Sequence, residues 1–215
     1  MTSLALQNFK NKMAENVTIL DTRNAADFSS GFIPGSIFIG LEGRFAEWAA
    51  NIISFVKPIL LITAPGKESE IASRLNRVGL DKIEGYLQGG FDVWINAGER
   101  TDMIINIEAD ELAMDIPHDN NLQVVDVRRE TEFADGHVKD AINMPLNEMT
   151  DLALLADFVE TQHLYVHSGN GYRSLIACSL LKSHGIHNLR NVLGGWEQIK
   201  EQATIKIATE PSMLN

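Results

Sequence analysis

The segment Val124-Val125-Asp126-Val127-Arg128 decides the fold, because a similar segment, Ile19-Leu20-Asp21-Thr22-Arg23, precedes it by 105 residues. The same offset brings Gly89-Gly90-Phe91 onto Gly194-Gly195-Trp196. A repeat of this length is too long for a solenoid unit, but it suits an independent small domain. The sequence therefore predicts two tandem copies of one domain.

Each copy contains short apolar runs that alternate with helical patterns. In the second copy, residues 122–127 and 164–167 are apolar or β-branched runs, and residues 174–183 have helical apolar spacing. Short, nearly uninterrupted apolar strands separated by helices predict an α/β fold, in which helices flank a mostly parallel sheet. We expect the first domain to span residues 1–100 and the second to span residues 101–215.

The composition excludes several classes of protein. Of the 215 residues, 45% are hydrophobic and 22% are charged, a mixture typical of folded globular proteins. The net charge of −11 disfavours nucleic acid and anionic membrane surfaces, so we expect neither as a partner. The longest apolar stretches, such as residues 59–62, are far shorter than the ~20 residues of a membrane span. With one cysteine and no visible secretion signal, we expect a cytoplasmic protein.

One loop of the second copy has the features of an anion site. The segment Ser168-Gly169-Asn170-Gly171-Tyr172-Arg173-Ser174 lies between an apolar strand and a helix. A tight glycine-containing loop that opens a helix directs several backbone N–H groups into one concave space, where the helix N-terminus favours an anion. Arg173 adds side-chain donors. The alternative interpretation is an ordinary strand-to-helix turn.

The spacing in this loop resembles that of the rhodanese family. The family's loop has a cysteine, four residues, an arginine, and a serine or threonine; here Ser168 is followed by four residues and then by Arg173. The segments Asp126-Val127-Arg128 and Leu193-Gly194-Gly195-Trp196 are similar to the family's first and last signatures. The resemblance covers nearly the whole chain and implies two rhodanese-like domains. It also implies sulfurtransferase chemistry, in which a cysteine thiolate takes up a sulfane sulfur, holds it as a persulfide and passes it to a thiophilic acceptor.

Ser168 stands where the resemblance places the cysteine nucleophile. A hydroxyl lacks both the acidity and the soft sulfur that a persulfide needs. We therefore expect a pseudoenzyme in sulfur metabolism, in which the nucleophile position is inactive. The loop residues expected to bind a small sulfur oxyanion or a persulfide, without a cofactor or metal, are Gly169, Asn170, Gly171, Tyr172, Arg173 and Ser174.

Three alternatives stay open beside this hypothesis. The first is an active thiosulfate sulfurtransferase whose catalytic cysteine has been replaced by Ser168 by design. The second is a phosphatase-like loop, but those loops carry five residues between cysteine and arginine, and four residues separate Ser168 from Arg173. The third is a Ser–His hydrolase using His167; it is disfavoured because adjacent strand residues project to opposite faces.

The first copy has no expected nucleophile. Aligning the apolar runs puts Ala64 opposite Ser168, and the segment Ala64-Pro65-Gly66-Lys67 holds neither a thiol nor an arginine. We expect the first domain to serve packing and partner contact. The single cysteine, Cys178, falls inside a predicted helix, where we expect a small buried apolar residue. We expect Asp126 and Arg128 to tie loops together.

A narrower resemblance concerns residues 58–68, which are similar to the tandem rhodanese region behind a metallo-β-lactamase-fold domain in persulfide-dioxygenase-like fusions. The zinc site of that domain needs a His-x-His-x-Asp-His cluster, which the six histidines of this chain do not form. The resemblance implies a persulfide dioxygenase partner of that fold, either fused in a longer polypeptide or separate.

Overall fold

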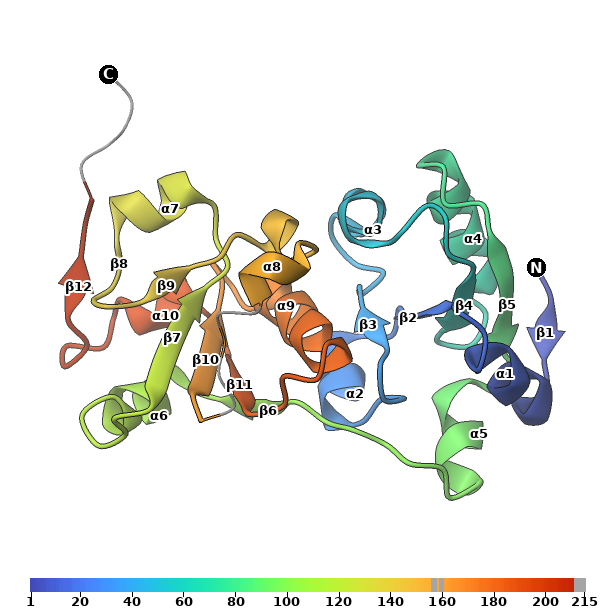
Figure 1. The fold of residues 1–215 in the computed structure, drawn as a ribbon, viewed down its shortest axis with the longest axis horizontal. Helices are drawn as coiled ribbons and strands as arrows, with labels where there is room; N and C mark the ends of the chain where they lie inside the picture. The colour runs from blue at the N-terminus through green and yellow to red at the C-terminus, as the bar shows by residue number, and fades with distance from the viewer. Residues whose placement is uncertain (156–157, 159–160, 211–215) are drawn as a thin grey trace. The chain divides into compact units, whose positions relative to one another are not determined.

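The chain divides into two compact units, Met1–Met103 and Ile104–Asn215 (Figure 1). The structure is a computed structural model and describes residues 1–155, 158 and 161–210. Each unit has its own parallel sheet with flanking helices, which confirms the prediction of two tandem α/β domains.

The first unit is built on a five-stranded parallel sheet in the order β1-β5-β4-β2-β3. Its strands are β1 (Ser3–Leu4), β2 (Thr18–Asp21), β3 (Ile37–Phe38), β4 (Ile59–Ile62) and β5 (Ile83–Leu87). Its helices are α1 (Leu6–Met13), α2 (Ala25–Ser30), α3 (Phe45–Ile52), α4 (Glu68–Arg77) and α5 (Gly90–Asn96).

The second unit repeats this plan in a parallel sheet of order β6-β11-β10-β7-β9, with a small antiparallel pair, β12-β8. Its strands are β6 (Ile105–Ile107), β7 (Leu122–Asp126), β8 (His137–Val138), β9 (Ile142–Asn143), β10 (His163–His167), β11 (Leu189–Val192) and β12 (Ile207–Ala208). Its helices are α6 (Ala109–Asp115), α7 (Glu130–Asp135), the 3₁₀ turn η1 (Leu146–Glu148), α8 (Leu152–Leu155), α9 (Tyr172–Ser183) and α10 (Trp196–Ile199).

Strands β4 and β10 are the central strands of the two sheets, and each is followed by a loop that opens a helix. Loops at the carboxyl ends of central parallel strands are where α/β proteins bind ligands. The loop predicted to bind an anion therefore lies where the fold positions functional groups.

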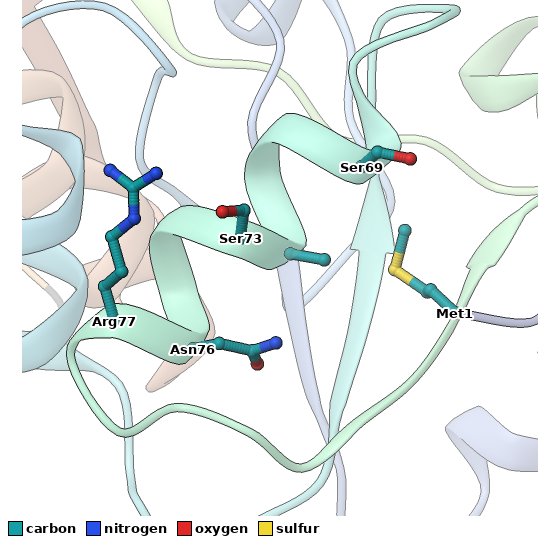
Figure 2. A pocket seen from close by; sticks show the side chains of 6 residues that line it. Met1, Ser69, Ser73, Asn76 and Arg77 are labelled. Carbon is teal, nitrogen blue, oxygen red and sulfur yellow. The ribbon is translucent and has the colours of Figure 1, made fainter.

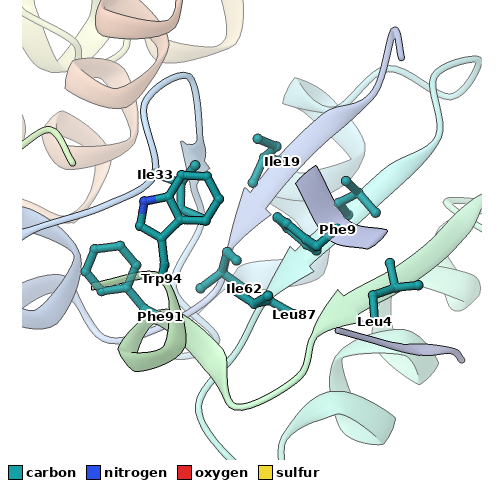
Figure 3. Close-up of a cluster of buried hydrophobic side chains, with 9 residues drawn as sticks. Leu4, Phe9, Ile19, Ile33, Ile62, Leu87, Phe91 and Trp94 are labelled. Atoms are coloured by element: carbon teal, nitrogen blue, oxygen red, sulfur yellow. The ribbon is translucent and has the colours of Figure 1, made fainter. Parts of the chain in front are cut away.

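One hydrophobic cluster of the first unit joins its strands to α1 and α5. Apolar side chains of the strands pack there against Phe9 of α1 and against Phe91 and Trp94 of α5 (Figure 3). The indole Nε1 of Trp94 donates to the carbonyl of Arg100 at 2.9 Å, so the chain after α5 folds back onto that helix. The strand residues Ile19, Leu60, Ile62 and Leu87 are buried, as their apolar runs predict.

Helix α9 differs from the amphipathic helix expected at this position. Its residues from Ser174 to Leu181 are all buried, and the helix packs against β10, β11 and η1. The side chains of this helix are small enough to be buried on every face, and Ala177 and Cys178 are fully buried. The hydroxyl of Ser179 donates a hydrogen bond to the carbonyl of Ile176 at 2.7 Å, so its burial leaves no polar group unpaired. This helix therefore offers the loop that precedes it, residues 168–171, a rigid support.

Candidate functional site

Ser168 directly follows β10 and is fully buried. Its hydroxyl oxygen accepts a hydrogen bond from the backbone N–H of Gly171 at 3.2 Å. Its carbonyl accepts another from the N–H of Trp196 at 2.6 Å, and the N–H of Glu197 donates to the carbonyl of Gly169 at 3.1 Å. The first two residues of α10 thus fix both peptide groups at the start of the loop.

Gly195 makes this fixation sterically feasible. A Cβ atom at this position would lie 2.2 Å from the carbonyl oxygen of Ser168, a distance that no side chain tolerates. Its backbone, at φ 55° and ψ −144°, also lies in a region that L residues avoid. The glycine pair of the last signature therefore brings the chain against the loop, which explains a motif that the sequence offered only by resemblance.

The remaining residues lead into α9: Gly169, Asn170 and Gly171 precede the helix, and Tyr172, Arg173 and Ser174 begin it. Gly171 has a φ of 95° and precedes the helix, so the loop turns sharply there. The backbone N–H of Tyr172 donates to the Asn170 side chain at 3.3 Å, and the Ser174 hydroxyl donates to the carbonyl of Gly171 at 3.0 Å. The predicted residues from Ser168 to Ser174 thus share one strand-to-helix turn, with Asn170 exposed and Ser168 buried beneath it.

Arg173 is bound by an acidic residue that sequence reasoning had left without a role. Its Nη1 and Nη2 atoms donate to the two carboxylate oxygens of Glu132 on α7, each at 2.7 Å. This bidentate pair, with desolvation acting against it, lowers the pKa of Glu132 to about 2. Glu132 also accepts from the backbone N–H of Arg129 at 3.1 Å. A glutamate three residues into a helix signals such a cap, but no local pattern predicts its bond to Arg173.

Asp126 and Arg128 brace the site rather than face a ligand. The Arg128 guanidinium makes three hydrogen bonds of 2.6–3.0 Å to the Asp126 carboxylate. The same group donates to the carbonyl of Gly136 at 2.7 Å and lies over the Trp196 ring, 4.5 Å from its centroid. The prediction that these two residues tie loops together is confirmed.

His167 is buried beside Ser168 but does not activate it. Its Nδ1 lies 3.3 Å from the Ser168 carbonyl, and its Nε2 is 3.6 Å from Asp126 Oδ2. Burial lowers the pKa of the imidazole, which favours its neutral form. Among the described residues, the hydrogen-bond partner of Ser168 Oγ is the backbone N–H of Gly171 rather than His167, so the arrangement gives no support to a Ser–His hydrolase.

The loop of the first unit differs from the expected alignment by one residue. In the sheets, Asp21 pairs with Ile62 just as Asp126 pairs with His167, so the residue after each strand is Thr63 in one unit and Ser168 in the other. The prediction of Ala64 at this place is wrong. A one-residue shift leaves both runs apolar, and side-chain composition alone cannot fix the register of buried strands.

Thr63 is a buried hydroxyl, so the first loop lacks a thiol as expected. Its Oγ1 donates to Glu68 Oε1 at 3.3 Å, and the backbone N–H of Gly66 donates to the same oxygen at 3.3 Å. A carboxylate of the chain itself therefore occupies the donors of this loop.

Cys178 lies in α9 and is fully buried. Burial raises the pKa of its thiol, so the thiolate is strongly disfavoured. The prediction of a small buried apolar residue is confirmed.

An open depression of about 570 Å³ lies along α4, lined by Met1 and by Ser69, Ala72, Ser73, Asn76 and Arg77 (Figure 2). It contains no residue of the repeated motifs. Over the described part of the chain, no group of three or more His, Cys, Asp or Glu side chains is placed to hold a metal ion. None of the helices described here has the length and apolar character needed to cross a membrane.

Comparison with known proteins identifies relatives of both units. The family model of the rhodanese-like domain matches residues 5–97 and again residues 108–202. A Bacillus subtilis protein named "Putative sulfur carrier protein YrkF" is 25% identical over 100 residues, which are 46% of this chain and 53% of that protein. This chain therefore spans about half the length of that relative. A protein of Allochromatium vinosum named "Sulfurtransferase" is 24% identical over 93 residues, 43% of this chain and 85% of the relative.

Among solved structures, the thiosulfate sulfurtransferase from Pseudomonas aeruginosa matches 98% of this chain and 44% of its own chain, with 18% identity and a TM-score of 0.41. The two matches to the family model include both strand-to-helix loops and both glycine pairs. The chain therefore belongs to the family of rhodanese-like domain proteins, of which it carries two domains in tandem.

Proposed function

We propose that the second domain is a rhodanese module that binds a small sulfur oxyanion or a persulfide without transferring its sulfur. The observation that carries this proposal is Ser168, a buried hydroxyl at the start of an otherwise complete loop. Gly171 N–H already donates to its oxygen, as it would to an anionic sulfur at the same place. Oxygen cannot hold a persulfide, so the loop retains its donors while losing the acceptor of sulfur.

The names of the relatives favour sulfur chemistry for this loop. One is named a sulfur carrier and another a sulfurtransferase, and the match to each covers less than half of this chain. In this proposal, Gly169, Asn170, Gly171, Tyr172, Arg173 and Ser174 surround the ligand, while the first domain supplies a scaffold. The partner would be a persulfide dioxygenase of metallo-β-lactamase fold, an assignment that depends on the sequence resemblance.

A sulfur-transfer assay from thiosulfate to cyanide tests the proposal. The unmodified chain is compared with Ser168→Cys, and circular dichroism checks that both fold. We expect no turnover by the unmodified chain and measurable turnover by the variant, because a thiol placed beside the Gly171 N–H and the N-terminus of α9 would ionise more readily. Turnover by the unmodified chain would overturn the assignment of Ser168 as an inactive position.

The second candidate function is that of an active thiosulfate sulfurtransferase in which Ser168 replaces a cysteine by design. The intact surroundings of Ser168 favour it, because the carbonyl contact to Trp196 and the turn at Gly171 are both present. The sequence of the organism's gene at this codon separates the two candidates. Absence of turnover in Ser168→Cys, together with no detectable thiosulfate binding by calorimetry, would argue against both.

A further inference from the structure

The second domain places two arginines at its loop, and each is paired with a carboxylate. Arg128 is held by Asp126 through hydrogen bonds of 2.6–3.0 Å. Arg173 is held by Glu132 through two hydrogen bonds of 2.7 Å. Each pair has a net charge of zero, so neither arginine gives the loop an uncompensated positive charge.

The pair formed by Arg173 and Glu132 lies against the loop itself. A Cβ atom on Gly169 would be only 3.1 Å from Arg173 Nη2, so the guanidinium covers the peptide that follows Ser168. The side chains of Arg173 and Glu132 are 20% and 35% exposed, which limits the access of water and salt to the pair. An anion bound at the loop would therefore experience the carboxylate of Glu132 as well as the guanidinium.

The remaining donors of the loop are dipoles rather than full charges. They come from the backbone of the glycine turn and from the first turn of α9, a helix of 12 residues. Dipoles of this kind bind singly and doubly charged anions alike. The full charges beside the loop therefore decide how strongly a second negative charge is favoured. The net charge of −11 over the whole chain adds to the cost of a doubly charged ligand.

We propose that Glu132 is a specificity-determining residue, which cancels the charge of Arg173 so that the loop favours singly charged sulfur anions over doubly charged oxyanions. This inference rests on the proposed function, because it concerns the ligand of the same loop. It assigns to Arg173 a net electrostatic contribution near zero while Glu132 is in place.

Calorimetric titration with two probes tests the inference: thiosulfate, which is doubly charged, and thiocyanate, which is singly charged. In Glu132→Gln, the freed charge of Arg173 acts on each probe in proportion to the charge of that probe. We expect the variant to bind thiosulfate about tenfold more tightly than the unmodified chain and thiocyanate about threefold more tightly. Glu130→Gln is the matched control; Glu130 is exposed two positions earlier on α7, and its loss should leave both affinities unchanged.

The double variant Glu132→Gln with Arg173→Gln replaces the ion pair with a neutral pair and gives a second test, which does not leave an arginine unpaired. Because the pair has no net charge before or after this change, thiosulfate affinity should stay within about threefold of the unmodified chain. Arg173→Gln alone leaves Glu132 uncompensated and should weaken thiosulfate more than thiocyanate. Thermal unfolding of each variant shows whether it is folded.

The outcomes separate the inference from the function on which it rests. If Glu132→Gln and Glu130→Gln bind thiosulfate with the same affinity, or if the neutral pair loses binding as completely as Arg173→Gln does, Glu132 does not set the charge preference and anion binding still stands. If neither probe binds to the unmodified chain or to any of these variants, the anion-binding function and the inference both fail.

Discussion

The strand-to-helix loops of the two domains rest on the same buried frame, an Asp–Arg pair with a carbonyl and an aromatic ring, but they differ in the side chains of the loop itself. Behind the first loop, Arg23 binds Asp21 and the carbonyl of Gly31 and lies over the ring of Phe91, 4.1 Å from its centroid. Behind the second, Arg128 makes the same set of contacts, to Asp126, Gly136 and Trp196. The buried pairs and the aromatic residue thus serve the fold in both domains.

The loops diverge only after the buried hydroxyl. In the first, the carboxylate of Glu68 accepts from Thr63 and from the backbone of Gly66. In the second, the acid lies outside the loop, on α7, where Glu132 binds Arg173. The comparison teaches that the same buried contacts can support a loop whose donors are taken by a carboxylate next to it in the chain, as in the first domain, or a loop whose acid lies on another helix, as in the second.

The largest expected effect comes from breaking the shared frame. Arg128→Met should lower the free energy of unfolding of the second domain by about 3–5 kcal/mol, because it leaves Asp126 buried without its counter-charge. Arg23→Met should cost the first domain a similar amount through Asp21. Urea denaturation followed by hydrogen exchange of peptides from each domain measures both values.

Equal losses of unfolding free energy in Arg128→Met and Arg23→Met would support the conclusion that the Asp–Arg pair has the same role in both domains. A cost below about 1 kcal/mol in either domain would mean that its aspartate is stabilised without the arginine and that the two frames are not equivalent.

The next effect concerns the glycines that approach the two loops. Gly195→Ala should destabilise the second domain by about 2–4 kcal/mol, because the new Cβ would lie 2.2 Å from the Ser168 carbonyl. Gly90→Ala in the first domain should cost about 1–2 kcal/mol, since its Cβ would lie 3.3 Å from the Thr63 carbonyl and a φ of 65° is the main penalty.

Thermal and urea unfolding of the two variants give the comparison, with Gly98→Ala as a control for a positive φ, here 70°, in open space. A smaller cost for Gly195→Ala than for Gly90→Ala would show that the second loop yields more easily than the first.

A smaller effect should appear as a dependence of stability on pH. The pKa of Glu132 is lowered from 4.5 to about 2 by Arg173, so ionisation of this group stabilises the folded state above pH 4.5. That contribution, about 1 kcal/mol after allowance for the exposure of the pair, is lost as the pH falls from 4.5 through about 2.

Comparison of the unmodified chain with Glu132→Gln between pH 7 and pH 2 measures this contribution. The two stability curves should differ at neutral pH and converge in acid, whereas Glu130→Gln should follow the unmodified chain throughout. A constant difference at all pH values would assign the effect to packing rather than to charge.

The smallest effect is expected at the acid of the first loop. Glu68→Gln replaces a charged acceptor with a neutral one and should cost about 0.5 kcal/mol, because both hydrogen bonds to its oxygen are 3.3 Å long. Differential scanning calorimetry of the full chain can detect the shift in the transition of the first domain. A change larger than that of Glu132→Gln at neutral pH would reverse the proposed order of the two acids.

The sequence predicted the features that depend on repetition and on short-range pattern. The offset between Asp21 and Asp126 predicted two similar domains, and the apolar context of Cys178 predicted its burial. The position of the Asp and Arg residues at the end of a strand predicted that they tie neighbouring loops together, and the structure shows that they do so as a pair.

What the sequence missed depends on register and on long-range contacts. The strand before Thr63 is buried and apolar on both faces. It therefore has no alternation of polar and apolar residues from which the sequence could predict where the strand ends. The bond between Arg173 and Glu132 joins residues 41 positions apart, and nothing in either local segment distinguishes that partner from the other acids of the chain. The burial of α9 was missed because its small polar residues satisfy their hydroxyls within the helix.

The strand order has a consequence for synthesis. In each domain the first strand to leave the ribosome, β1 or β6, pairs with the last strand of its sheet, β5 or β11. Asn106 thus meets its partner Asn191 only after 85 further residues have been made. All strands of the first sheet have been synthesised before the second domain is complete. In each domain, however, the first strand, β1 or β6, has no partner strand until nearly the whole domain has been synthesised.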